Sequence, residues 1–256
     1  MGVLFEADPA THVAVITIDR PEARNAVNGE VATGIEEALD AIEADDDIWV
    51  SILTGTPPVF SAGADLKVVN AGKDREMRTR KGGFAGLIRR ERVKPLIAAV
   101  DGHALAGGTE IVLACDLVVA STKATFGLPE VKRCLVAGGG GLFRLGRKIP
   151  ITIAMEWALT GEAYPATRAY EVGLVNELCE PGQAVATARK LAERITVNAP
   201  LAVQYSRDVV LNATSLPDSE AWQISNEATR KVAKTNDFKE GVQAFIDKRP
   251  PEWTAS

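Results

Sequence analysis

The residues best suited to chemistry are two glutamates, each at the end of a short turn-forming segment. Glu110 ends the segment 102–110 (GHALAGGTE), and Glu130 ends the segment 126–130 (FGLPE). Two carboxyl groups near one another can move protons, because one accepts a proton while the other donates one. Two close carboxylates do not both ionise freely, so we expect the pair to share a proton and to titrate as a unit. Considered alone, Glu110 is equally well explained as a helix-start residue that the helix dipole stabilises.

Both glutamates lie in or beside glycine-rich segments, and a third segment of this kind is 60–67 (FSAGADLK). Small residues let a ligand approach the backbone, and the first turn of a helix leaves N–H groups without partners. Four consecutive glycines in the run 136–141 (VAGGGG) would weaken an ordinary helix. Their presence therefore indicates that close packing or the approach of a ligand requires glycine there. Each segment alone is also typical of a tight turn or a flexible loop.

The elements that would hold these segments alternate between strand and helix. We predict strands at 12–18, 49–55, 96–100 and 116–121, and helices at about 28–44 and 107–114. Such alternation favours an α/β class with right-handed crossovers. Beyond Gly138 the spacing is helical, except for a short strand near 174–178. The predicted helices cover 150–158, 165–172, 183–197, 200–212, 217–234 and 237–247.

Composition argues against several classes of protein, namely those that bind nucleic acid, metal ions or membranes. The chain has 256 residues, 46% of them hydrophobic, and a formal net charge of −5, so its overall charge does not favour nucleic acid. Its 3 cysteines are widely spaced, and its 2 histidines lack a metal partner at useful spacing. No segment approaches the roughly 20 apolar residues that span a bilayer. We therefore expect a cytoplasmic protein that binds neither metal, membrane nor nucleic acid.

The three glycine-rich segments, in this order and at these separations, resemble the crotonase (enoyl-CoA hydratase/isomerase) family. The similarity extends from about Val13 to Trp253. It implies a spiral of ββα units followed by helices that assemble trimers or a dimer of trimers. We assign residues 1–195 to the α/β core and 196–256 to the C-terminal helical region. The resemblance implies enoyl-CoA hydration in fatty-acid or related acyl-CoA metabolism, without a cofactor beyond the coenzyme A of the substrate.

The resemblance also implies roles for individual residues. Ala64 and Gly107 match the two backbone N–H donors of the family's oxyanion hole. Glu110 and Glu130 match the two glutamates that hold a water molecule in hydratases. Gly138 matches a glycine whose backbone helps to orient that water.

Contacts to coenzyme A are implied for three further segments. The segment 20–26 (RPEARNA) resembles a nucleotide-binding stretch, and the C-terminal 244–249 (AFIDKR) resembles a helix that contacts coenzyme A, often across a subunit interface. The implied residues are Ala23, Arg24, Ala62, Ala64, Asp65, Leu66, Lys67, Gly107, Phe245 and Lys248. Lys248 is equally well explained as a solvated cation on a helix.

Several alternatives remain open. The segment after Glu130 departs from the family pattern, with Cys134 and Ala137 where glycine and proline are expected. Other segments resemble the carnitinyl-CoA dehydratase branch, so the acyl group is not determined. An enoyl-CoA isomerase would use Glu130 as its main acid/base. A non-catalytic CoA-binding or RNA-binding relative is the alternative of another class, because many cations lie between Asp65 and Pro95.

Overall fold

The protein is built on a central six-stranded sheet, and a computed structural model describes residues 2–256. The strand order is β1-β2-β3-β6-β8-β11, and every neighbouring pair is parallel except β1 and β2. A three-stranded sheet, β10-β9-β7, and the hairpin β4–β5 complete the β-structure. The strands are β1 (Val3–Asp8), β2 (Val13–Ile18), β3 (Val50–Gly55), β4 (Arg78–Thr79), β5 (Gly83–Phe84), β6 (Leu96–Val100), β7 (His103–Leu105), β8 (Leu117–Ser121), β9 (Thr125–Gly127), β10 (Ala163–Pro165) and β11 (Glu177–Cys179).

Helices cover the sheet and then continue beyond it. The α-helices are α1 (Gly29–Ala44), α2 (Leu66–Asn70), α3 (Gly107–Ala114), α4 (Gly141–Lys148), α5 (Ile151–Thr160), α6 (Ala166–Glu171), α7 (Ala184–Thr196), α8 (Pro200–Ala213), α9 (Asp218–Val232) and α10 (Asn236–Asp247). Short 3₁₀ helices are η1 (Pro21–Ala23), η2 (Asp74–Met77) and η3 (Pro129–Arg133). Among residues 2–256, no helix combines the length and apolar character needed to cross a bilayer.

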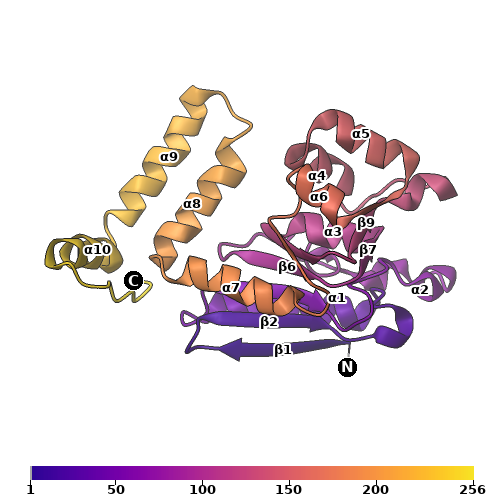
Figure 1. Ribbon diagram of the computed structural model, residues 1–256, viewed down its shortest axis with the longest axis horizontal. Coiled ribbons are helices and arrows are strands. Elements are labelled where there is room, and N and C mark those ends of the chain that lie inside the picture. The colour runs from indigo at the N-terminus through magenta and orange to yellow at the C-terminus, as the bar shows by residue number, and fades with distance from the viewer. Residues whose placement is uncertain (1) are drawn as a thin grey trace.

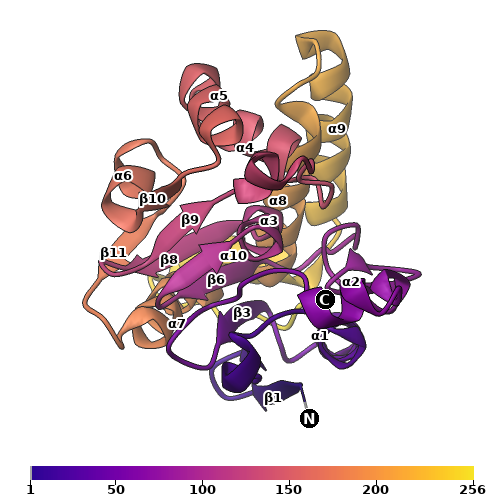
Figure 2. The same ribbon diagram turned by 90° about the vertical axis from the view of Figure 1, so that its right-hand side faces the viewer.

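Both faces of the inner strands β2, β3, β6 and β8 are buried, as expected for parallel strands with crossover helices, whereas the edge strand β1 is mostly exposed. Alternate strand residues face opposite sides. Ile16 and Leu53 pack with the buried face of α1 in the larger core, whereas Val15 and Ile52 pack with Ala188 of α7 in the smaller one. In Figures 1 and 2, α4 and α5 lie on the side of the molecule opposite β1.

The predicted α/β class is confirmed, and most elements lie close to their expected bounds. The strand expected at 174–178 begins later, at Glu177, because Leu174 and Val175 are buried in the preceding turn. The sequence patterns gave no prediction of β1 or α4. The run of glycines does not exclude α4, because its last member, Gly141, is the first residue of that helix.

The C-terminal helices α8 to α10 project away from the sheet (Figure 1). They contribute few buried side chains, and α9 buries only Ala228. Large apolar residues on them are solvent-exposed in the single chain, including Trp222 at 63% and Phe245 at 86%. This region therefore lacks a hydrophobic core of its own.

Candidate active site

One cavity of about 880 Å³ collects residues from all three glycine-rich segments. These segments meet because they follow the carboxyl ends of the parallel strands β3, β6 and β8, where ligands commonly bind in α/β folds. Most of the site residues predicted from the sequence line this cavity: Ala23, Arg24, Ala62, Ala64, Asp65, Leu66, Lys67, Gly107, Glu110, Glu130 and Gly138.

The backbones of the first two segments approach one another closely. A Cβ atom at Gly107 would lie 3.2 Å from the Cα atom of Gly63 and 2.7 Å from the Phe84 ring, so only glycine fits at 107. The N–H groups of Ala64 and Gly107 donate to no other described residue. Two such donors at the cavity wall are suited to bind an oxygen on which negative charge develops.

Ala106 fixes the direction of the Gly107 N–H group. It has a φ of 51° and a ψ of −124°, a conformation that strains a residue with a side chain. Its own N–H donates to the Gly127 carbonyl on β9 at 2.9 Å, and its carbonyl accepts from the Glu110 N–H at 3.1 Å. These bonds hold the strained peptide at the start of α3.

Glu110 lies in the first turn of α3 and is 5% exposed. Its Oε1 accepts a hydrogen bond from the Gly141 N–H at 3.0 Å. Burial raises the pKa of the Glu110 carboxyl above its ordinary value, although the N–H groups of Gly141 and Gly139 and the charges of Arg144 and Arg78 oppose the rise. The carboxyl is therefore poised to hold a proton at higher pH than an exposed glutamate.

Glu130 lies in η3 and lines the same cavity. Burial raises its pKa too, and the nearby charge of Glu110 raises it further against the opposing charge of Arg133. Its Oε2 atom is buried and has no hydrogen-bond partner among residues 2–256. A buried carboxyl oxygen normally has a partner, so this atom is available to a ligand or a water molecule.

The glycine run after Glu130 is explained by its closeness to Glu110. A Cβ atom at Gly139 would lie 2.4 Å from Glu110 Oε2, a distance that no side chain can occupy. The run is thus neither a flexible loop nor a simple turn, because it wraps the buried carboxylate. Gly138 lines the cavity, but the N–H groups that act on Glu110 belong to Gly139 and Gly141.

The mouth of the cavity is formed where residues 20–26 pack on residues 61–65. The Ala62 N–H donates to the Arg24 carbonyl at 3.0 Å. The Asp65 carboxylate pairs with Arg20 at 3.1 Å and accepts from the Lys67 N–H at 3.0 Å, which caps α2. The Asp65 side chain therefore holds the mouth together, whereas the Arg24 and Lys67 side chains are exposed beside it.

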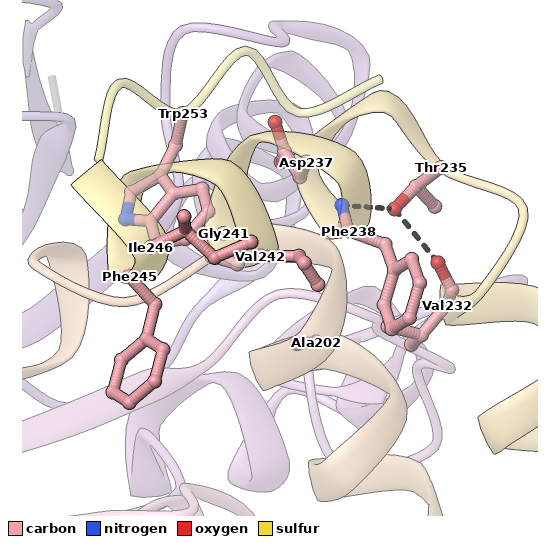
Figure 3. Close-up of a pocket in the computed structure, with 11 residues that line it drawn as sticks. Ala202, Val232, Thr235, Asp237, Phe238, Gly241, Val242, Phe245, Ile246 and Trp253 are labelled. Carbon is pink, nitrogen blue, oxygen red and sulfur yellow. Dashed lines mark hydrogen bonds between the residues drawn. The ribbon is translucent and has the colours of Figure 1, made fainter.

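Phe245 and Lys248 are the two predicted site residues that do not line this cavity. Phe245 lines a separate, largely apolar groove of about 460 Å³ between α8, α10 and the C-terminal segment, and its ring points away from Trp253 (Figure 3). Lys248 follows the last residue of α10 as its C-cap, with a φ of 54°. In Figure 1, α10 and α2 lie at opposite ends of the molecule. Within one chain, these two residues cannot join the catalytic cavity.

Several residues that position the site had no sequence signal. The buried Thr109 hydroxyl donates to the Ala104 and Gly127 carbonyls at 2.6 and 2.9 Å, which ties the start of α3 to β7 and β9. Ala106 acts through its backbone conformation, and the Arg144 guanidinium donates to the Gly139 carbonyl. A threonine, an alanine and an arginine are too common to attract notice, although the Ala-Gly-Gly turn at 106–108 could have suggested a strained residue.

Comparisons with known proteins agree with this geometry. The family model for enoyl-CoA hydratase/isomerase matches residues 9–256. Enoyl-CoA hydratase EchA19 of Mycobacterium tuberculosis is 39% identical, covering 94% of this chain and 93% of the relative. Carnitinyl-CoA dehydratase of Salmonella typhi is 36% identical, covering 93% of each. The crystal structure of an enoyl-CoA hydratase from M. tuberculosis H37Rv superposes with a TM-score of 0.95 at 46% identity, covering 100% of this chain and 99% of that one. The chain belongs to the enoyl-CoA hydratase/isomerase, or crotonase, family.

Proposed function

We propose that the protein is an enoyl-CoA hydratase, which adds water across the α,β double bond of a 2-enoyl-CoA thioester to give a 3-hydroxyacyl-CoA. The observation that carries this proposal is the placement of two carboxyl groups, the buried Glu110 and the half-buried Glu130, in one cavity with two N–H donors that are unpaired among residues 2–256. Both carboxyl pKa values are raised, as proton transfer near neutral pH requires. The names of the relatives are consistent with this chemistry.

The thioester oxygen would accept from the N–H groups of Ala64 and Gly107. When water adds to Cβ, negative charge develops on this oxygen, and each fixed donor contributes roughly 3 to 4 kcal/mol to its stabilisation. The donors belong to the rigid backbone, so they need no reorganisation during the reaction.

The water molecule would lie between the two glutamates. One carboxylate accepts a proton from the water as its oxygen bonds to Cβ, and the other carboxyl supplies a proton to Cα, so addition is syn and the charge balances. The unpaired Oε2 of Glu130 supports a water partner there. This scheme uses two carboxyls and a water molecule, so we propose that it needs no cofactor beyond the coenzyme A of the substrate. Dialysis against a chelator should then leave the rate unchanged.

The direct test is hydration of crotonyl-CoA, followed as loss of the conjugated thioester absorbance with confirmation of the product by mass. A set of longer and branched 2-enoyl-CoA substrates would rank the acyl groups. Conversion of 3-enoyl-CoA alone would indicate an isomerase, and preferred dehydration of carnitinyl-CoA would indicate that branch of the family. Binding of coenzyme A or RNA without turnover of any of these compounds would contradict the proposal.

We further infer that the chain assembles as a homotrimer or a dimer of trimers. Support comes from the exposed apolar side chains of α8 to α10 and from the groove that contains Phe245. In such an assembly, Phe245 and Lys248 would reach the coenzyme A bound to a neighbouring subunit. Light scattering on the purified protein would establish the subunit number, and a monomer that retains full activity would contradict this arrangement.

A further inference from the structure

Arg144 lies directly behind the glutamate site without entering it. It is a half-buried residue of α4 and is not part of the cavity lining. Its guanidinium reaches two backbone segments on different sides of the site. It therefore does not touch substrate, and any effect on the reaction must pass through the groups that it holds.

The first of these segments is the glycine turn around Glu110. Arg144 Nη1 donates to the Gly139 carbonyl at 3.1 Å, and the Arg144 backbone N–H donates to the Gly140 carbonyl at 3.1 Å. One residue thus holds two consecutive peptides of the turn. The second of these peptides carries the Gly141 N–H that donates to Glu110.

The second segment forms the wall beside the oxyanion donors. Arg144 Nη2 donates to the Ile88 carbonyl at 2.5 Å. Ile88 belongs to the same connection as Phe84, and the Ile88 N–H donates to the Phe84 carbonyl at 3.3 Å. The Phe84 ring packs at Gly107. The guanidinium therefore links the turn that holds Glu110 to the wall that supports the Gly107 donor.

The charge of Arg144 also acts on Glu110. Among the charged groups near this carboxyl, Arg144 on α4 and Arg78 on β4 lower its pKa, while Glu130 on η3 is the like-charged neighbour. Arg144 is the one of these groups that is also bonded to the turn around the carboxylate.

We propose that Arg144 is a positioning residue for Glu110. Its guanidinium fixes the position of the glycine turn relative to the backbone at Ile88, and it places a positive charge near the buried carboxylate. This inference deepens the proposed function, and its kinetic test rests on that function.

Two variants separate the roles of geometry and charge. Arg144→Met removes both, so we expect kcat to fall about 10- to 100-fold with a small change in KM. The acid limb of the kcat/KM profile should move to higher pH by roughly half a unit, because loss of an opposite charge raises the pKa of Glu110. Arg144→Lys keeps the charge without the two-pronged contact, so kcat should fall while the acid limb stays near its wild-type position.

Arg147 provides the matched control. It is an exposed arginine on the same helix, and like Arg144 it lies over the Phe143 ring, at 5.1 Å. Arg147→Met should therefore retain the wild-type kcat and pH profile. In Arg144→Gly, millimolar guanidinium chloride should restore part of kcat, which a residue needed only for folding would not allow.

A titration that does not depend on turnover distinguishes failure of this inference from failure of the hydratase assignment. The Glu110 carboxyl can be followed by carbon NMR and assigned by its loss in Glu110→Gln. A higher pKa in Arg144→Met than in wild type supports the inference even if no enoyl-CoA is hydrated. An unchanged Glu110 titration in both Arg144 variants, or a wild-type pH profile in Arg144→Met, would overturn it.

Discussion

The α/β part of the chain and the C-terminal helices use their side chains in opposite ways. In the α/β part, buried side chains fill two cores, and the strand ends bring two glutamate side chains and two backbone N–H donors into one cavity. In α8 to α10, few side chains are buried and many large apolar ones face outward. The α/β part brings both glutamates and both N–H donors together within one chain. The exposed apolar side chains of α8 to α10 are instead suited to contact another subunit.

The largest effect should come from the glutamates in the α/β part. Glu110→Gln or Glu130→Gln should lower kcat by roughly 10³-fold or more with a modest change in KM, because proton transfer in the transition state is lost. Crotonyl-CoA hydration measures the effect. Glu156→Gln on α5 changes an exposed glutamate and should behave as wild type. Near-normal turnover in both site variants would contradict the assigned roles.

A somewhat smaller loss should follow from disturbing the oxyanion donors. Gly107→Val places a side chain against the Phe84 ring, where even a Cβ atom would lie 2.7 Å away. We expect kcat to fall about 10²-fold, comparable to the loss of one donor. Gly146→Ala on α4 is the control, because its Cβ would meet only the flexible end of Ile151 at 3.3 Å. Equal activity of the two variants would show that the Gly107 backbone is not used.

The C-terminal helices should affect binding more than chemistry. Phe245→Ala should raise KM for crotonyl-CoA about 10-fold and leave kcat nearly unchanged, because the glutamates lie in the α/β part. Lys239→Ala, also exposed on α10, should change neither constant. A fall in kcat without a change in KM in Phe245→Ala would contradict the assignment of binding to the C-terminal helices and of chemistry to the α/β part.

The smallest effect concerns stability. A carboxyl whose pKa is raised by folding contributes stability that is fully present at pH below its unfolded pKa and is lost as pH rises through the folded pKa. Glu130 has such a raised pKa. Glu130→Gln should therefore raise Tm by about 2 °C at pH 8 relative to wild type and by less at pH 4. Thermal unfolding at the two pH values measures this difference, and a larger gain at pH 4 would contradict the direction of the shift.

Sequence patterns identified residues that lie together in one cavity, but they did not identify the residues that support that cavity. Glu110, Glu130, Ala64 and Gly107 were identified because their segments have a recognisable order, and all four line one cavity. The edge strand β1 pairs with β2, but most of its residues are exposed. Its sequence therefore lacks the alternation of apolar and polar residues that would predict a strand.

Helix α4 and the support that it provides also had no sequence signal. The glycine run disfavours a helix locally, but only its last member, Gly141, lies in α4. The role of Arg144 depends on backbone carbonyls from residues far apart in the chain, which a sequence pattern does not display. The placement of Phe245 away from the cavity likewise depends on the path of three helices.

The central claim is that Glu110 and Glu130 together deliver a water molecule to an enoyl-CoA. The most direct measurement is incubation of crotonyl-CoA with the protein in H₂¹⁸O, followed by mass analysis of the product. We predict a 3-hydroxyacyl-CoA that carries one labelled oxygen, formed rapidly by wild type and by Glu156→Gln, and not by either site variant. Unlabelled product, no product, or equal labelling by the site variants would contradict the account.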